Sequence, residues 1–214
     1  MTGADERRSS VRPAAPVDVV FEPESSRVPA LQAMRSTILL SCIASVTRAG
    51  MYDRYRACLD PAAARALDEA VAGTWLSVDV ALAHYAACDA MGAPRSQHVQ
   101  LGMDAAEISK TALVGTALRL ASMAGTDAWT FLGMVGRFWP RAYQGSAVRV
   151  IRRGPKEALV DVIEHGVLLA SPYARSTFRG FCASLVAPFC EQIYVRELGV
   201  DPRMRRVSFI AQWV

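Results

Sequence analysis

Alternating apolar and polar positions predict β-strands at both ends of the chain. VDVVF, residues 17–21, is a short β-branched run that predicts an edge strand. SAVRVIR and EALVDVIE are joined by RGPK, so residues 146–164 predict a hairpin. The segment RVSFIAQWV, residues 206–214, has the alternation of a half-buried antiparallel strand, with Val207, Phe209, Ala211 and Trp213 separated by Ser208 and Gln212.

Helical periodicity occupies most of the chain between these strands. Asp60 precedes Pro61, which predicts an N-cap followed by a proline at the first helical position. Asp104 and Glu107 have the spacing of a capping box. We expect helices over residues 29–46, from Asp60 onward, and over 77–91, 104–123, 127–139 and 172–190. The helix 127–139 should end at Pro140 and bury one face, formed by Ala128, Phe131, Leu132, Val135 and Trp139.

These elements predict an α+β fold with a helical N-terminal layer packed on a small antiparallel sheet crossed by a C-terminal helix. Residues 1–16 are polar and rich in alanine and proline, so we expect a disordered tail there. Residues 17–214 should form a single domain, because a chain of 214 residues builds one good core.

Composition and charge exclude several classes of protein. The first residues lack the apolar segment of a secretory signal, and no apolar run approaches the ~20 residues of a membrane span. The five cysteines are scattered, with no disulfide framework, so a cytoplasmic protein is expected. The net charge is only +4, and the basic residues at 152–153 and 203–206 are interpreted as solvated turn charges, so no nucleic-acid partner is expected.

Motifs of catalysis and metal binding are absent. No pair of histidines or cysteines has the spacing of a metal site, and the chain lacks a nucleophile elbow, a dinucleotide-binding motif and a phosphate-binding loop. His84 shares a helix stripe with Val80 and Cys88, which suits either a packed histidine or a haem ligand. His98 is placed in a surface loop and His165 in a turn, while Asp161 faces either solvent or a pocket. We therefore expect no catalytic residue and no metal ligand.

Large aromatic residues concentrate near the junction of helix and sheet. Trp129, Phe131, Phe138, Trp139 and Tyr143 lie within 15 positions of one another. Such a group either lines a pocket for a small molecule or fills the core.

The chain resembles a paralogous family of myxobacterial proteins whose function is open. The resemblance lies in CLDPAAARALDEAVAGTWLSVDVALAHYAACDAMG (residues 58–92), MDAAEISKTALVG (103–115) and the tail from YQGSAVRV to FIAQWV (143–214). That family is distantly similar in fold to haem-nitric-oxide-binding, 4-vinyl-reductase-type and TRAPP-type domains. This implies a sensory or scaffold module that binds haem, an apolar ligand or a partner protein, often as a dimer.

The resemblance also bears on metal and haem. In 4-vinyl-reductase-type domains an acidic residue and two later cysteines bind a metal, and Glu197 matches the acid, but no cysteine follows Cys190. Cys182 and Cys190 are therefore expected to fill the core. In haem-nitric-oxide-binding domains a Tyr-x-Ser-x-Arg motif contacts the haem, whereas Tyr173, Arg175 and Ser176 lack that spacing and no histidine matches the proximal ligand. We expect no cofactor.

The leading hypothesis is a non-enzymatic, homodimeric sensory or adaptor module that binds a small apolar ligand or a protein partner. Trp129, Trp139 and Tyr143 are the candidate ligand-binding residues, with His84 and Tyr85 as polar candidates. Three alternatives stay open: a scaffold with a filled core that works through its surface, an enzyme on an apolar substrate with His84 or Asp161 as base, and a haem gas sensor.

Overall fold

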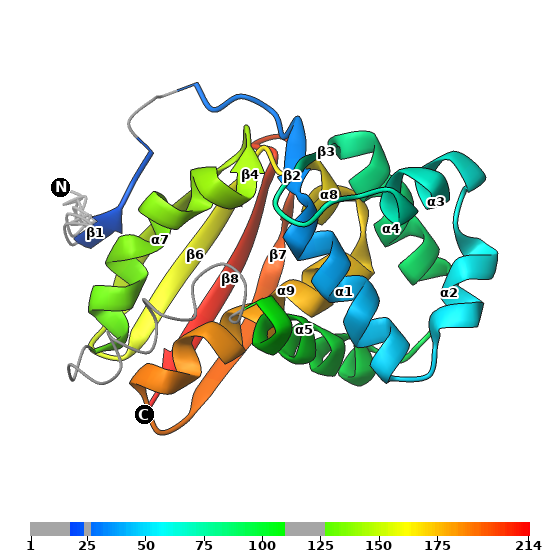
Figure 1. Cartoon of the computed structure of the whole chain (residues 1–214). Coiled ribbons are helices and arrows are strands. Elements are labelled where there is room, and N and C mark those ends of the chain that lie inside the picture. The colour runs from blue at the N-terminus through cyan, green and yellow to red at the C-terminus, as the bar shows by residue number, and fades with distance from the viewer. Residues whose placement is uncertain (1–17, 24–26, 110–126) are drawn as a thin grey trace, which may run out of the picture.

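The computed structural model describes residues 18–23, 27–109 and 127–214 and has an α+β architecture (Figure 1). The expected tail at 1–16 and residues 110–123 of the helix expected at 104–123 lie outside the described residues. The main sheet has the order β1-β5-β6-β8-β7, and every neighbouring pair is antiparallel. Its strands are β1 (Asp18–Phe21), β5 (Ala147–Gly154), β6 (Glu157–Ile163), β7 (Ile193–Asp201) and β8 (Arg206–Trp213).

The sheet confirms the strand predictions made from alternation. β1 is an edge strand, β5 and β6 form the hairpin, and β8 lies between β6 and β7. The register aligns Val150, Val160 and Phe209 in one row across three strands. This row and its neighbours give the sheet an apolar inner face.

Helices form the N-terminal half of the molecule, on the right of Figure 1. They are α1 (Ser36–Arg48), α2 (Tyr52–Cys58), α3 (Pro61–Asp68), α4 (Val78–Ala90) and α5 (Arg95–Ser109). The predicted cap is present, because the Asp60 carboxylate accepts hydrogen bonds from the backbone N–H groups of Ala62 and Ala63. The helix expected at 77–91 is α4, and the Ser77 hydroxyl accepts a bond from Val80 N.

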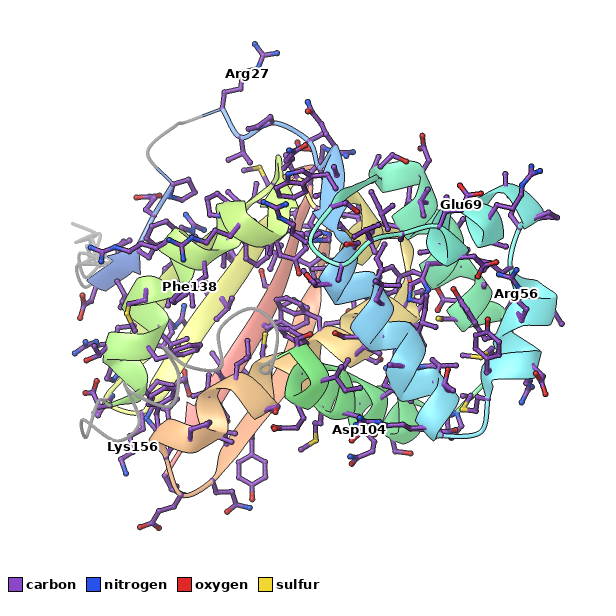
Figure 2. All side chains as sticks on the ribbon, in the orientation of Figure 1. Arg27, Arg56, Glu69, Asp104, Phe138 and Lys156 are labelled. Atoms are coloured by element: carbon purple, nitrogen blue, oxygen red, sulfur yellow. The ribbon has the colours of Figure 1, made fainter. Side chains whose placement is uncertain are left out.

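Two of the expected helix starts are wrong. Residues 33–35 form β2 rather than helix, because β2 pairs with β3 (Trp75–Ser77) on one side and β4 (Tyr143–Gln144) on the other. Asp104 does not begin a helix either, since it lies inside α5 (Figure 2), where its carboxylate accepts a bond from Gln100. The capping-box spacing was accidental, and the helix begins nine residues earlier.

Helices α7 (Ala128–Ala142) and α9 (Pro172–Val186) cover the inner face of the sheet, with the short α8 (Gly166–Ala170) between them in sequence. The helix expected at 127–139 passes through Pro140, and its last turn is closed by Tyr143 N donating to Trp139 O. The helix expected at 172–190 ends at Val186 and continues as a 3-10 turn, Ala187–Phe189.

Helix α9 is held against the helical half at two points. The Asp89 carboxylate at the end of α4 accepts hydrogen bonds from Ser171 Oγ and Tyr173 N at the start of α9, at 2.5 and 2.7 Å. Farther along, α9 crosses α5 at two glycines. A Cβ on Gly180 would overlap the carbonyl oxygen of Val99, and one on Gly102 would overlap that of Thr177. The backbones of α5 and α9 are therefore in direct contact.

We predict that Gly180→Ala lowers the free energy of unfolding by about 3 kcal/mol, because the added methyl group forces two packed backbones apart. The measurement is urea unfolding followed by circular dichroism.

Gly133→Ala is the matched control, since its Cβ would meet only Val20 Cγ1, at 3.9 Å. That substitution should leave stability unchanged or raise it by up to about 1 kcal/mol. Equal stability of Gly180→Ala and the wild type would contradict the close crossing.

Candidate functional site

An apolar cavity of about 180 Å³ lies between α7, α9 and the inner face of the main sheet. Its floor is the valine and phenylalanine row of β5, β6 and β8, and Ile38 of α1 and Ser109 of α5 also line it. The principal wall residues are Phe131, Leu132, Val135, Phe138, Trp139, Phe178, Phe181, Cys182 and Leu185.

Two helix stripes supply the walls of the cavity. On α7, the face predicted from periodicity lines it through Phe131, Leu132, Val135 and Trp139. On α9, Phe178, Phe181, Cys182 and Leu185 follow the i, i+3, i+4, i+7 spacing of one helical face. The α9 wall was missing from the predicted site, although this spacing is visible in the sequence.

Two of the five predicted ligand-binding residues line the cavity. Trp139 and Tyr143 both do, with ring centroids 4.5 Å apart. The Trp139 indole N–H donates to Ser146 Oγ at 3.1 Å, so this donor is already used within the protein.

The other three predicted residues lie outside this cavity. Trp129 donates its indole N–H to Pro155 O at 2.6 Å and packs edge-on against Trp213. His84 is fully buried among the helices, where Nδ1 hydrogen-bonds the Tyr55 hydroxyl at 2.8 Å. Tyr85 lines a smaller void of about 30 Å³, large enough for about one or two waters. A role for these three in ligand binding stays a prediction.

The smaller void adjoins the cavity through shared wall residues. Ile38, Tyr143, Phe178 and Phe181 line both. His165 also lines the smaller void, with its ring centroid 4.9 Å from that of Tyr143. Tyr143 is therefore one of the side chains that lie between the large cavity and the smaller void.

Burial keeps the titratable groups of this region uncharged. It raises the pKa of the Cys182 thiol to about 12, so this sulfur is a neutral thiol at pH 7. It also raises the pKa of the Tyr143 hydroxyl. It lowers the pKa of His165 to about 3, so the imidazole is neutral, and its Nδ1 accepts from Leu168 N at the start of α8.

Several single-residue expectations are corrected here. Asp161 is 1% exposed rather than solvent-facing, because Arg149 and Ser208, opposite it on the neighbouring strands, both hydrogen-bond its carboxylate. His98 is buried in α5 against Tyr173, not in a surface loop. Cys182 borders empty space instead of filling the core, and Cys190 is partly exposed.

Three of the basic residues near the turns and the candidate acid Glu197 are paired within the chain. Arg152, Arg205 and Arg206 form ion pairs with Asp18, Glu164 and Asp201 respectively. Glu197 pairs with Arg175 at 2.9 Å. Within the described residues no group of three or more His, Cys, Asp or Glu side chains converges as a metal site.

Solved H-NOX proteins share this fold. An Fe(II) unliganded H-NOX protein from K. algicida aligns with a TM-score of 0.58 at 11% identity, over 85% of this chain and 97% of that one. A structure from work on haem redox potential and porphyrin distortion gives 0.56 at 12% identity, and one on haem distortion in the H-NOX family gives 0.55 at 12%. Each of these two alignments covers 84% of this chain and 95% of the other.

These likenesses support the predicted distant similarity to haem-nitric-oxide-binding domains at the level of the fold. No family model matches the chain, and no curated protein matches it. Membership of the myxobacterial paralogue family therefore stays a prediction.

The residues around the cavity do not fit a haem. Haem iron in proteins takes axial ligands such as histidine, thiolate, methionine or tyrosinate. None of the three histidines and no described methionine lines the cavity, and burial keeps Cys182 and Tyr143 protonated. The volume is also below the ~300–1,000 Å³ of pockets that hold drug-sized ligands, a size that a porphyrin reaches.

We predict that acid destabilises the protein as its buried histidines become protonated. Burial lowers the pKa of both His84 and His165 to about 3, against about 6.5 for an unfolded chain. Their contribution to stability is complete above pH 6.5 and is lost as the pH falls toward 3. At pH 5 each histidine should cost about 2 kcal/mol relative to pH 7.

The measurement is urea unfolding at pH values from 7 to 4.5, for the wild type and His84→Gln. The glutamine amide can still hydrogen-bond Tyr55 but does not titrate. Its free energy of unfolding should depend less steeply on pH, by about 1.4 kcal/mol per pH unit below pH 6. Identical slopes would mean that His84 is not held neutral by burial.

Proposed function

We propose that this chain is a non-enzymatic, cytoplasmic sensory or adaptor module that binds a small apolar ligand in the cavity between α7, α9 and the sheet. The observation that carries the proposal is the cavity itself, because protein cores are otherwise close-packed. Voids lined by aliphatic and aromatic groups take up small apolar molecules. A cytoplasmic location is in keeping with the five cysteines, all of which are free.

Helix α9 offers a route from the ligand to the rest of the molecule. Its Phe181 and Cys182 line the cavity, while the neighbouring Gly180 contacts the α5 backbone at Val99. A ligand that favours one position of α9 therefore also favours one position of α5. This coupling is what a sensory module requires.

The enzyme hypothesis lacks a base at the cavity. Asp161 lies in the strand position next to Val160 and so points to the opposite face of the sheet from the cavity floor. His84 is buried elsewhere, bonded to Tyr55. None of the described residues that line the cavity is an Asp, Glu or His.

Membrane insertion finds no support among the helices. No helix in the described ranges has the length and hydrophobicity that a bilayer crossing requires.

The proposal includes a homodimer, for which β7 is the candidate contact. This strand is at the edge of the main sheet, and Tyr194 and Leu198 project from it with exposed side chains. Edge strands of two copies can pair and bury such side chains. Sedimentation velocity should show a dimer for the wild type and a monomer for Tyr194→Arg. A monomeric wild type would remove this part of the proposal.

We predict that ethylbenzene stabilises the protein. At a concentration one hundred times its Kd it should add about 2.7 kcal/mol to the free energy of unfolding and raise the Tm by about 5–10 °C. Differential scanning calorimetry measures the shift.

Cys182→Phe places a ring in the cavity and should abolish the shift. Cys190→Phe is the matched control, because Cys190 does not line the cavity, and it should retain the shift. A wild-type Tm that does not move at any soluble concentration of ethylbenzene would favour the scaffold hypothesis.

A further inference from the structure

The charge on the cavity wall is positive, with no acidic side chain among the described lining residues. Most lining residues are apolar, and the described ones include a single charged side chain, Arg141. Ser109 is 4% exposed, and its hydroxyl has no hydrogen-bond partner among the described residues. Within the described ranges the wall thus carries one cation, one buried hydroxyl without a hydrogen-bond partner, and no anion.

Arg141 lies where the cavity meets solvent. Its side chain is exposed, yet it lines the same space as Phe138. Phe138, labelled in Figure 2, lies one turn earlier on α7. The guanidinium carbon is 5.9 Å from the centroid of the Phe138 ring. Arg141 has no carboxylate within ion-pair distance in the described part of the chain, whereas Arg149, Arg152, Arg175, Arg205 and Arg206 each have one.

The size of the cavity limits the apolar part of a ligand. A dry cavity of ~150 Å³ lined by aliphatic and aromatic side chains holds one benzene molecule. The present cavity, at about 180 Å³, matches one ring with a short substituent. The cavity is lined by the rings of Phe131, Phe178 and Phe209, which suit an aromatic ligand. Contacts between aromatic rings stabilise a complex beyond what the buried apolar area alone gives.

The positive charge of Arg141 at the entrance favours a substituent that carries a negative charge. An anion buried among valines and phenylalanines would lose its hydration without compensation, but an anion beside Arg141 stays partly hydrated and gains a charge-assisted hydrogen bond. A planar carboxylate matches the guanidinium fork with two parallel bonds.

Resting on the proposed ligand-binding function, we propose that the physiological ligand is a small aromatic monocarboxylate. Its ring occupies the cavity between α7, α9 and the sheet, and its carboxylate binds the Arg141 guanidinium at the entrance. The Ser109 hydroxyl on the wall is available to a polar substituent on that ring.

Three probes of nearly equal size test this proposal: phenylacetate, phenylacetamide and ethylbenzene. Isothermal titration calorimetry at pH 7 should show that phenylacetate binds at least tenfold more tightly than phenylacetamide, its neutral isostere. Arg141→Gln should weaken phenylacetate binding at least tenfold and leave the ethylbenzene affinity within twofold.

Arg137→Gln is the matched control, because it removes one positive charge from the same helix at an exposed residue that does not line the cavity. It should leave all three affinities within twofold. If phenylacetate and phenylacetamide bind equally while ethylbenzene binds, the carboxylate inference is overturned and the cavity function stands. If none of the three binds, the proposed function itself is overturned.

Discussion

The contact between the backbones of α5 and α9 is the constraint on which the position of α9, and with it the cavity wall, depends. Gly102 of α5 and Gly180 of α9 let the two helices approach very closely. A Cβ atom on either glycine would overlap the backbone of the other helix. Together with the Asp89 carboxylate at its N-terminus, this contact positions α9 against the helical half. Arg175 and Arg179 of α9 also bind β7 at the edge of the sheet, through the Glu197 carboxylate and the Val195 carbonyl. The space that remains between α9 and the inner strands of the sheet then depends on the lengths of the side chains that face it.

The space between α9 and the sheet stays open because most side chains on the sheet side are short. The sheet presents mainly valines at this level, with Ala211 and Phe209 beside them. Val150 and Val160 form the centre of the row with Phe209. Close packing would require either longer side chains here or an α9 that moves toward the sheet. The helix crossing opposes that movement, so the void persists in a molecule that otherwise buries its apolar residues well.

The fold is that of haem-binding proteins, but the residues at the cavity do not suit haem. The likeness to H-NOX proteins extends over most of the chain, yet the donors around the cavity do not suit haem iron. Function depends on the residues at a site more than on the fold that carries them. A cavity with one arginine at its entrance selects a small acid, and the same architecture with other wall residues would select something else.

The sequence by itself determined the elements whose signals are local. Asp60 and Ser77 cap their helices through bonds to residues two or three positions away, and the hairpin and the last strand follow from alternation within eight residues. The face of α7 that lines the cavity was also predictable, because periodicity shows which residues share a side.

Only the tertiary structure decided the rest. Residues 33–35 form strand β2 because they pair with strands that lie about 40 and 110 residues later in the chain. Asp161 can be buried because Arg149 and Ser208 hydrogen-bond its carboxylate from the adjacent strands. Whether the aromatic residues filled a core or left a cavity depended on the distance between α9 and the sheet, and no local pattern encodes a distance between elements.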